Sequence, residues 1–283
     1  KSSYTISLNK YILIFLMVTC GFSQDRLEVP NFEKSYLDID KSILTLYSEN
    51  TKIQIDINDL TLTESPISFP TIKNVDYITK KRNRLLFFEN GSGTVFEEKN
   101  LIIQRIDKSN INQNLINSSF FKYNDTIFRH GGYGYWSVFN KLIYFDESTN
   151  EWEYHSRPSY KGRFNHNIFI EDDKVYLVGG YSLDDLLKKQ ERQLEVSLAE
   201  IDMINNQTKF LGDSNENVHG VKVENDIGKS IIIDNKQQIK ILNFSDNSVK
   251  TIFSNSLNTK ILREYKVYIH KDYFYFFSSA NNK

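Results

Sequence analysis

A short pattern that occurs twice, about one structural unit apart, most constrains the fold of this chain. One apolar strand runs into Gly131-Gly132 in IFRHGGYGYW, and another runs into Gly179-Gly180 in KVYLVGGYS, 48 residues later (179 − 131 = 48). In each copy a second apolar strand follows and ends in an aspartate before a polar turn. One such unit cannot bury its apolar faces alone, so the pattern predicts neighbouring units that stack.

Weaker copies extend the pattern along the chain. They lie at residues 42–62, 82–93, 228–252 and 271–280. The copy at residues 82–93 is followed by a second strand and a turn at Asp107 within residues 101–110. Glu89-Asn90 and Asp234-Asn235 replace the glycine pair in two copies. Asn and Asp tolerate positive φ better than most residues. We predict second strands of equivalent units that end near Ser48, Glu89, Gly131, Gly179, Asp234 and Ser278.

These copies predict an all-β fold, a β-propeller of four-stranded blades. A complete ring would hold about six or seven blades, and this chain supplies about five and a half, because the last unit stops after its second strand. Propellers close by pairing strands from the two termini, which removes open edges. Either N-terminal residues complete the last blade or the chain is a fragment, and the absence of Met at position 1 favours a fragment.

The residue order in the two strong copies resembles the kelch repeat of β-propellers. That repeat has Arg-x-x-His before a strand ending in Gly-Gly, then a strand ending in Tyr-Asp, then a fourth strand with Trp. The first copy matches at Gly131, Gly132, Tyr144, Asp146 and Trp152, and the second at Arg163, His166, Gly179, Gly180 and Asp202, with Phe210 near the Trp position. The resemblance is specific over residues 120–210, and the exported bacterial kelch proteins are the expected relatives. It implies that His166 packs within its blade.

The N-terminus carries an export signal. YILIFLMVTC (residues 11–20) is apolar but too short to span a bilayer, and the small residues Gly21 and Ser23 suit cleavage after Ser23. We therefore predict a signal peptide over residues 1–23 and one propeller domain over residues 24–283, exported to the periplasm, the cell surface or the medium. The alternatives are a buried N-terminal strand and a lipoprotein acylated at Cys20.

Composition excludes several classes of function. The net charge is −1 without a basic stripe, which argues against nucleic-acid binding, and no membrane span is expected within the chain. Cys20 is the single cysteine, so a cleaved chain could not form the tyrosine–cysteine copper cofactor of kelch-type galactose oxidases. The five histidines lack metal-ligand spacing, and no G-x-S-x-G motif occurs. We expect no cofactor and no metal, and we assign no catalytic residue.

The best candidate site is an aromatic loop after the first glycine pair. It contains Tyr133, Tyr135, Trp136 and Phe139, and the kelch-type Arg163 joins it as a ligand-binding residue. Rigid aromatics suit protein- and sugar-binding surfaces, so we predict a binding module for a protein or glycan ligand. The alternative is that these rings fill the core between blades.

Two other functions remain open on the sequence. One is an exported sugar-processing enzyme resembling the kelch-type sialic acid mutarotase, which would need an acid–base group or an arginine at the central channel. Arg129, Arg157 and Arg163 are the candidate arginines. The other is the sensor ectodomain of a longer membrane protein. Residues 182–196 form an insertion whose leucine spacing predicts a short amphipathic helix or a hairpin.

Overall fold

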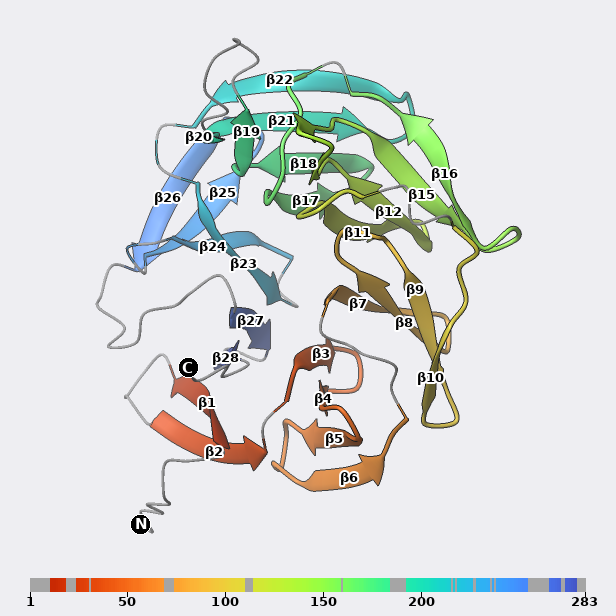
Figure 1. Ribbon diagram of the computed structural model, residues 1–283. Helices are drawn as coiled ribbons and strands as arrows, with labels where there is room; N and C mark the ends of the chain where they lie inside the picture. Colours follow the sequence, from red (N-terminus) through yellow and green to blue (C-terminus); the bar gives the residue numbers. More distant parts are fainter. Residues whose placement is uncertain are drawn as a thin grey trace.

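Five sheets radiate from a central axis like the blades of a propeller (Figure 1). The repeat pattern predicted this all-β architecture, and the structure confirms it. This computed structural model describes residues 11–18, 24–30, 32–68, 74–109, 114–158, 160–183, 192–214, 216, 218–225, 228–234, 236, 238–253, 265–270 and 273–278. Among these residues, no helix has the length and apolar character needed to cross a membrane.

Four of the sheets contain four antiparallel strands each, in chain order from the channel outward. The first has β3 (Lys34–Asp38), β4 (Ile43–Tyr47), β5 (Thr51–Asp56) and β6 (Leu62–Pro66). The second has β7 (Val75–Lys81), β8 (Arg84–Glu89), β9 (Val95–Lys99) and β10 (Ile102–Arg105). The third has β11 (Ser119–Tyr123), β12 (Thr126–His130), β15 (Leu142–Asp146) and β16 (Glu151–Ser156). The fourth has β17 (Asn167–Glu171), β18 (Lys174–Val178), β21 (Ser197–Asp202) and β22 (Gln207–Asp213).

The fifth sheet has eight strands and joins the two ends of the chain. One half contains β23 (Gly220–Asn225), β24 (Ser230–Asp234), β25 (Ile239–Asn243) and β26 (Ser248–Phe253). The other half contains β27 (Tyr265–His270) and β28 (Tyr273–Ser278), followed outward by β1 (Tyr11–Val18) and β2 (Gln24–Pro30). A parallel pairing of β23 with β27 connects the halves, and β1 pairs antiparallel with β28.

The N-terminal strands therefore complete the unit that the sequence leaves after its second strand. This matches the first of the two alternatives that the repeat pattern left open, because β1 pairs with β28 and β2 pairs with β1. The strand β1 coincides with the apolar part of the predicted signal peptide. Cleavage after Ser23 would remove it from the sheet, and that cleavage stays a prediction.

The predicted second strands occupy equivalent positions in the ring. They are β4, β8, β12, β18, β24 and β28, and each lies next to the innermost strand of its unit. The expectation for Asp107 was wrong. The turn of the second sheet is at Asn100-Leu101, where φ is 52° and 62°, and Asp107 follows β10. There its Oδ1 accepts a hydrogen bond of 2.9 Å from the N–H of Val95.

A β-bulge recurs at the same place in three successive units. The register shifts between Leu142 and Ile143, between Leu198 and Ala199, and between Ile239 and Lys240, always where the third strand meets the fourth. A bulge adds one unpaired residue and increases local twist.

The pairing of β21 with β22 corrects the assignment of Phe210. Trp152 pairs with Phe145, and the corresponding residue of the next unit is Thr208, which pairs with Ile201. Phe210 pairs instead with Ala199 and corresponds to Tyr154. The side chain of Phe210 is 58% exposed, whereas Trp152 is 5% exposed.

The glycine pairs combine an unusual backbone with a close approach. Gly131 and Gly180 have φ values of 68° and 92°, a region that L side chains rarely adopt. A Cβ on Gly180 would lie 2.7 Å from the carbonyl oxygen of Phe164, and a Cβ on Gly131 would overlap that of Arg163. Gly131 therefore leaves room for the loop that leads into the next blade, and Gly180 for the loop that leads into its own blade.

Asp234 closes the equivalent turn without glycine. Its Oδ1 accepts hydrogen bonds from the N–H groups of Lys236 and Gln238, at 2.8 and 2.9 Å. The buried ammonium of Lys240 lies 3.0 Å from Asp234 Oδ2 and 3.0 Å from Glu216 Oε2. Hydrogen bonds and an ion pair to the Asp234 carboxylate thus stabilise a turn that other units form with a glycine pair.

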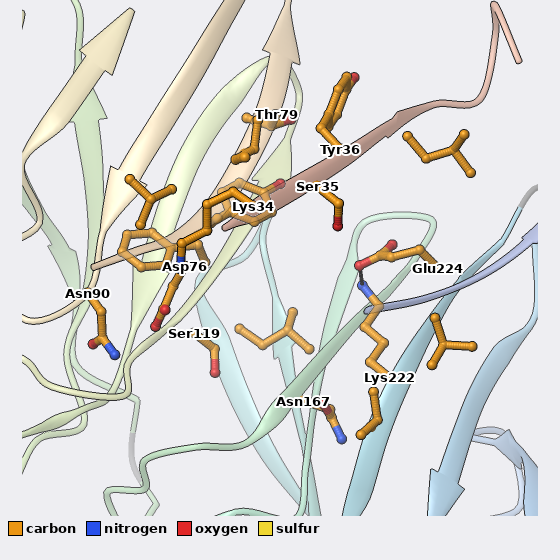
Figure 2. Close-up of a pocket in the computed structure, with 18 of the residues that line it drawn as sticks. Lys34, Ser35, Tyr36, Asp76, Thr79, Asn90, Ser119, Asn167, Lys222 and Glu224 are labelled. Atoms are coloured by element: carbon orange, nitrogen blue, oxygen red, sulfur yellow. Dashed lines mark ion pairs between the residues drawn. The ribbon is translucent and has the colours of Figure 1, made fainter. Parts of the chain in front are cut away.

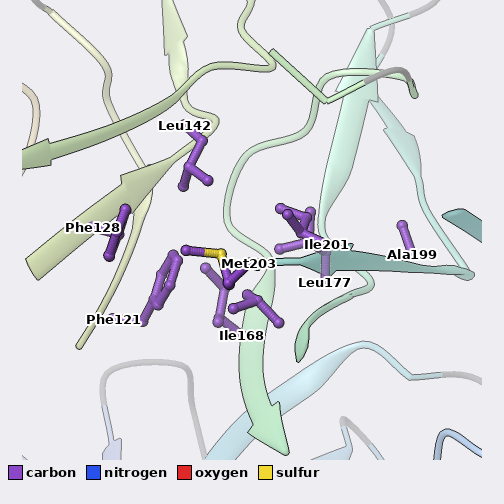
Figure 3. Close-up of a cluster of buried hydrophobic side chains, with 9 residues drawn as sticks. Phe121, Phe128, Leu142, Ile168, Leu177, Ala199, Ile201 and Met203 are labelled. Carbon is purple, nitrogen blue, oxygen red and sulfur yellow. The ribbon is translucent and has the colours of Figure 1, made fainter. Parts of the chain in front are cut away.

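The core lies between blades rather than within them. Figure 3 shows one such cluster, in which side chains of the third sheet face side chains of the fourth. Its buried members are Phe121, Phe128, Leu142, Ile168, Val175, Leu177, Ala199, Ile201 and Met203. Each face of a sheet is covered only by the neighbouring sheet, which is why a single unit could not fold alone.

The insertion after the second glycine pair begins and ends as a hairpin. Its strands β19 (Tyr181–Leu183) and β20 (Arg192–Leu194) pair antiparallel. This confirms the hairpin alternative for the two ends of the insertion, and residues 184–191 lie outside the described residues.

Candidate functional site: the central channel and the aromatic hairpin

A cavity of about 640 Å³ occupies the centre of the ring. It is lined by the innermost strands β3, β7, β11, β17, β23 and β27 and by the loops that lead into them. Polar side chains dominate the part drawn in Figure 2: Lys34, Ser35, Tyr36, Asp76, Thr79, Asn90, Ser119, Asn167, Lys222 and Glu224. The volume lies within the usual range for small-molecule sites, roughly 300–1,000 Å³.

The channel presents charges of both signs. Lys34 on β3 reaches toward Asp76 on the neighbouring β7 (Figure 2). On β23, the ammonium of Lys222 lies 3.1 Å from Glu224 Oε1. Since both cations and carboxylates line the wall, the channel is not built for a ligand of one strong charge.

Asparagines link adjacent blades at one mouth of the channel. Asn90 Nδ2 donates to Asn117 Oδ1 at 3.2 Å, and the N–H of Asn117 donates to Asn90 Oδ1 at 2.7 Å. The N–H of Asn165 then donates to the carbonyl oxygen of Asn117 at 2.7 Å. Asn117 and Asn165 both have positive φ, 56° and 58°. This hydrogen-bonded chain fixes the loops around the mouth relative to one another.

Two buried histidines join the third and fourth sheets beside the channel. His130 Nδ1 lies 3.0 Å from His166 Nε2, and Tyr160 Oη lies 3.1 Å from His130 Nε2. Burial, with a smaller contribution from the Arg163 charge, lowers the pKa of His130 to about 3. Burial, His130 and Arg163 also hold the pKa of His166 well below its ordinary value. Both rings are therefore neutral near pH 7 and join two blades, not one as the kelch resemblance implied for His166.

Two of the three candidate arginines support loops from beneath the surface. Arg129 donates to Ser118 Oγ at 2.6 Å and to the carbonyl oxygens of Gly91 and Leu115, each at 2.7 Å. Arg163 makes equivalent bonds, to the carbonyl oxygens of Gly179 at 3.2 Å and Ser197 at 3.0 Å. Both guanidinium groups are buried, and Arg157 is exposed.

The aromatic loop forms a small hairpin on the face where the glycine pairs lie. Its strands are β13 (Tyr133–Gly134) and β14 (Ser137–Val138), and Tyr135 and Trp136 form the two-residue turn. Their φ values of 48° and 63° are those of a type I′ turn. Tyr135 is 68% exposed and Trp136 is 76% exposed.

The other predicted aromatic residues support this hairpin. The ring of Tyr133 lies 5.8 Å from that of Phe164, and Phe139 packs against the core cluster of the second and third sheets. Tyr133 also exchanges two backbone hydrogen bonds of 2.8 Å with Ile116. The structure thus brings together all four aromatic residues. Tyr135 and Trp136 are exposed, and Tyr133 and Phe139 pack beneath them. The side chain of Arg163, the fifth predicted site residue, is buried.

Sequence reasoning missed the channel lining. Asn74, Asn117 and Asn165 each precede an innermost strand, which is a signal that an alignment of the units could have shown. The glycine pairs follow second strands and not innermost strands, so the sequence did not show which residues of the innermost strands face the channel. No group of three His, Cys, Asp or Glu side chains arranged to hold a metal occurs among the residues that the structure describes.

The fold is that of a β-propeller. The chain superposes on the solved structure of YjhT, a kelch propeller, with a TM-score of 0.61 over 86% of this chain and 88% of that one, at 12% sequence identity. No protein-family model matches the sequence, and no curated protein matches it. At this identity the likeness concerns the fold alone.

Proposed function

We propose that this propeller is a binding module that holds a protein or glycan ligand on the face carrying the hairpin β13–β14. The observation that carries the proposal is the exposure of Tyr135 and Trp136 at the tip of a rigid turn. Aromatic rings held in place bury contact area at a low cost in conformational entropy. Tyr135 and Trp136 do not contribute to the core, since the contacts that hold the hairpin in place come from Tyr133 and Phe139.

Binding accounts for the site better than a sugar-processing reaction does. An acid–base catalyst works best when its pKa lies near the working pH, and the two histidines beside the channel are shifted far below it. Arg129 and Arg163, which an enzyme of the mutarotase type would have used, are committed to backbone carbonyl oxygens. The groups that face the channel include both lysines and carboxylates, and such a lining suits polar contacts with a ligand.

Replacing Trp136 with alanine should abolish ligand binding and leave the melting temperature nearly unchanged, because the exposed indole contributes little to the core. The chain has two tryptophans, and Trp152 is buried, so Trp136 is the indole open to quenching by acrylamide. Titration of glycan and protein candidates against tryptophan fluorescence would identify a ligand, and isothermal titration calorimetry would compare the wild type with Trp136→Ala, which lacks the reporter. The matched control is Trp152→Phe, which keeps Trp136 as the reporter. Binding that survives in Trp136→Ala would rule out the hairpin as the site.

Export is part of the proposal and rests on residues 1–23. The mass of the chain recovered from the periplasm or medium should correspond to a start at Gln24, because the small residues Gly21 and Ser23 suit signal peptidase. Recovery of a chain that still contains residues 11–18 would contradict cleavage and would mean that β1 stays in the fifth sheet of the mature protein.

A further inference from the structure

The loops around the aromatic hairpin concentrate positive charge. Residues 130–142 and 156–167 contain four cationic residues and no Asp or Glu: Lys141, Arg157, Lys161 and Arg163. The chain as a whole has a net charge of −1. The positive charge is therefore local to the hairpin-bearing end of the third sheet.

These residues belong to one face because the strands that precede and follow them are paired. Leu142 at the start of β15 pairs with Ser156 at the end of β16, so Lys141 and Arg157 leave the sheet side by side. Asn140 Nδ2 donates to the carbonyl oxygens of Pro158, at 2.5 Å, and of Tyr160. Lys141 and Arg157 are exposed.

Part of this charge is compensated from the next blade. Glu195 lies 3.3 Å from the ammonium of Lys161, and its carboxylate also accepts hydrogen bonds from Ser182 and Ser197. Arg163 lies beneath them and donates to Ser197 Oγ at 3.0 Å. Lys161 is paired with Glu195 and Arg163 is buried, so the exposed Lys141 and Arg157 supply the positive charge next to Tyr135 and Trp136.

We propose that the ligand of this face is an acidic glycan, a polysaccharide that carries carboxylates. The inference rests on the proposed binding function and names its ligand class. The rings of Tyr135 and Trp136 would stack on sugar rings, while Lys141 and Arg157 would pair with carboxylates along the polymer.

The small apolar area favours a glycan over a protein partner. Beside the two aromatic residues, Ile116 is 41% exposed on the strand bridge that supports the hairpin. A stable protein interface buries roughly 800 Å² on each partner around an apolar centre. A sugar needs one or two ring platforms bordered by polar groups, which matches this surface.

The test uses polygalacturonate and the same polymer with its carboxylates methyl-esterified, which keeps the sugar rings and removes the charge. Polygalacturonate should change Trp136 fluorescence, and raising the salt from about 50 to about 500 mM should weaken the binding. The double variant Lys141→Gln/Arg157→Gln should bind about tenfold more weakly or worse, with an unchanged melting temperature. The matched control, Lys209→Gln/Lys250→Gln, removes two exposed lysines from the outer strands β22 and β26. It should bind like the wild type.

Each other outcome overturns the inference in a distinguishable way. Equal binding of both polymers would refute an acidic ligand and leave the binding module intact. Equal binding of polyglutamate, or charge-dependent binding that persists in Trp136→Ala, would show a simple ion-exchange surface in place of a glycan site. No binding of polygalacturonate would refute the acidic-glycan assignment, while a different ligand that requires Trp136 would still support the proposed function.

Discussion

Replacing Trp152 with alanine should lower the free energy of unfolding by about 3–5 kcal/mol. The indole is buried between the second and third sheets, where its ring lies 5.6 Å from that of Phe145 and 6.0 Å from that of Phe88. Its Nε1 donates to the carbonyl oxygen of Gly93 across the blade boundary at 2.7 Å. The substitution would open a cavity and leave that carbonyl oxygen without its donor. Urea unfolding followed by circular dichroism would measure the loss.

Two further variants separate the contributions of packing and hydrogen bonding. Trp152→Phe keeps an aromatic ring and removes the donor, so it should cost less than the alanine change, roughly 1–3 kcal/mol. Trp136→Ala removes the same side chain from the surface and should cost almost nothing. If Trp152→Ala were as mild as Trp136→Ala, the assignment of Trp152 to the core between blades would be wrong.

Acidification below about pH 6.5 should destabilise the propeller through its buried histidines. In the unfolded chain a histidine titrates near 6.5, and in the folded chain burial lowers the pKa of His130 to about 3. The unfolded state therefore binds more protons than the folded state across this window. The stability is complete above pH 6.5 and falls as the pH decreases toward 3. At pH 5 the loss from His130 alone amounts to about 2 kcal/mol.

The variant His130→Gln isolates this effect from that of the carboxylates. It removes the group whose pKa is shifted, so its free energy of unfolding should fall less between pH 7 and pH 5 than that of the wild type. The comparison concerns this change with pH, because the variant also loses the contact with His166, which lowers its stability at neutral pH. Equal changes in both proteins would mean that His130 is protonated in the folded state.

Local sequence determined the repeated elements of this protein. The glycine pairs, the alternation of strands and turns, and the second strands followed from short-range patterns, because positive φ and strand pairing are properties of neighbouring residues. The aromatic hairpin was also predictable as a candidate site, since its residues are contiguous. The division between exposed Trp136 and packed Phe139 was not, because burial depends on what the loop folds against.

Tertiary structure alone decided the features that join distant residues. The pairing of β1 with β28 closes the last unit, and it depends on where the ring brings the two chain ends. The contact of His130 with His166 depends likewise on the angle between two blades. The exposure of Phe210, like that of Tyr154 at the corresponding position, depends on what covers that part of the outer strand. Such contacts are set by register and by the geometry of ring closure, and neither leaves a short-range pattern in the sequence.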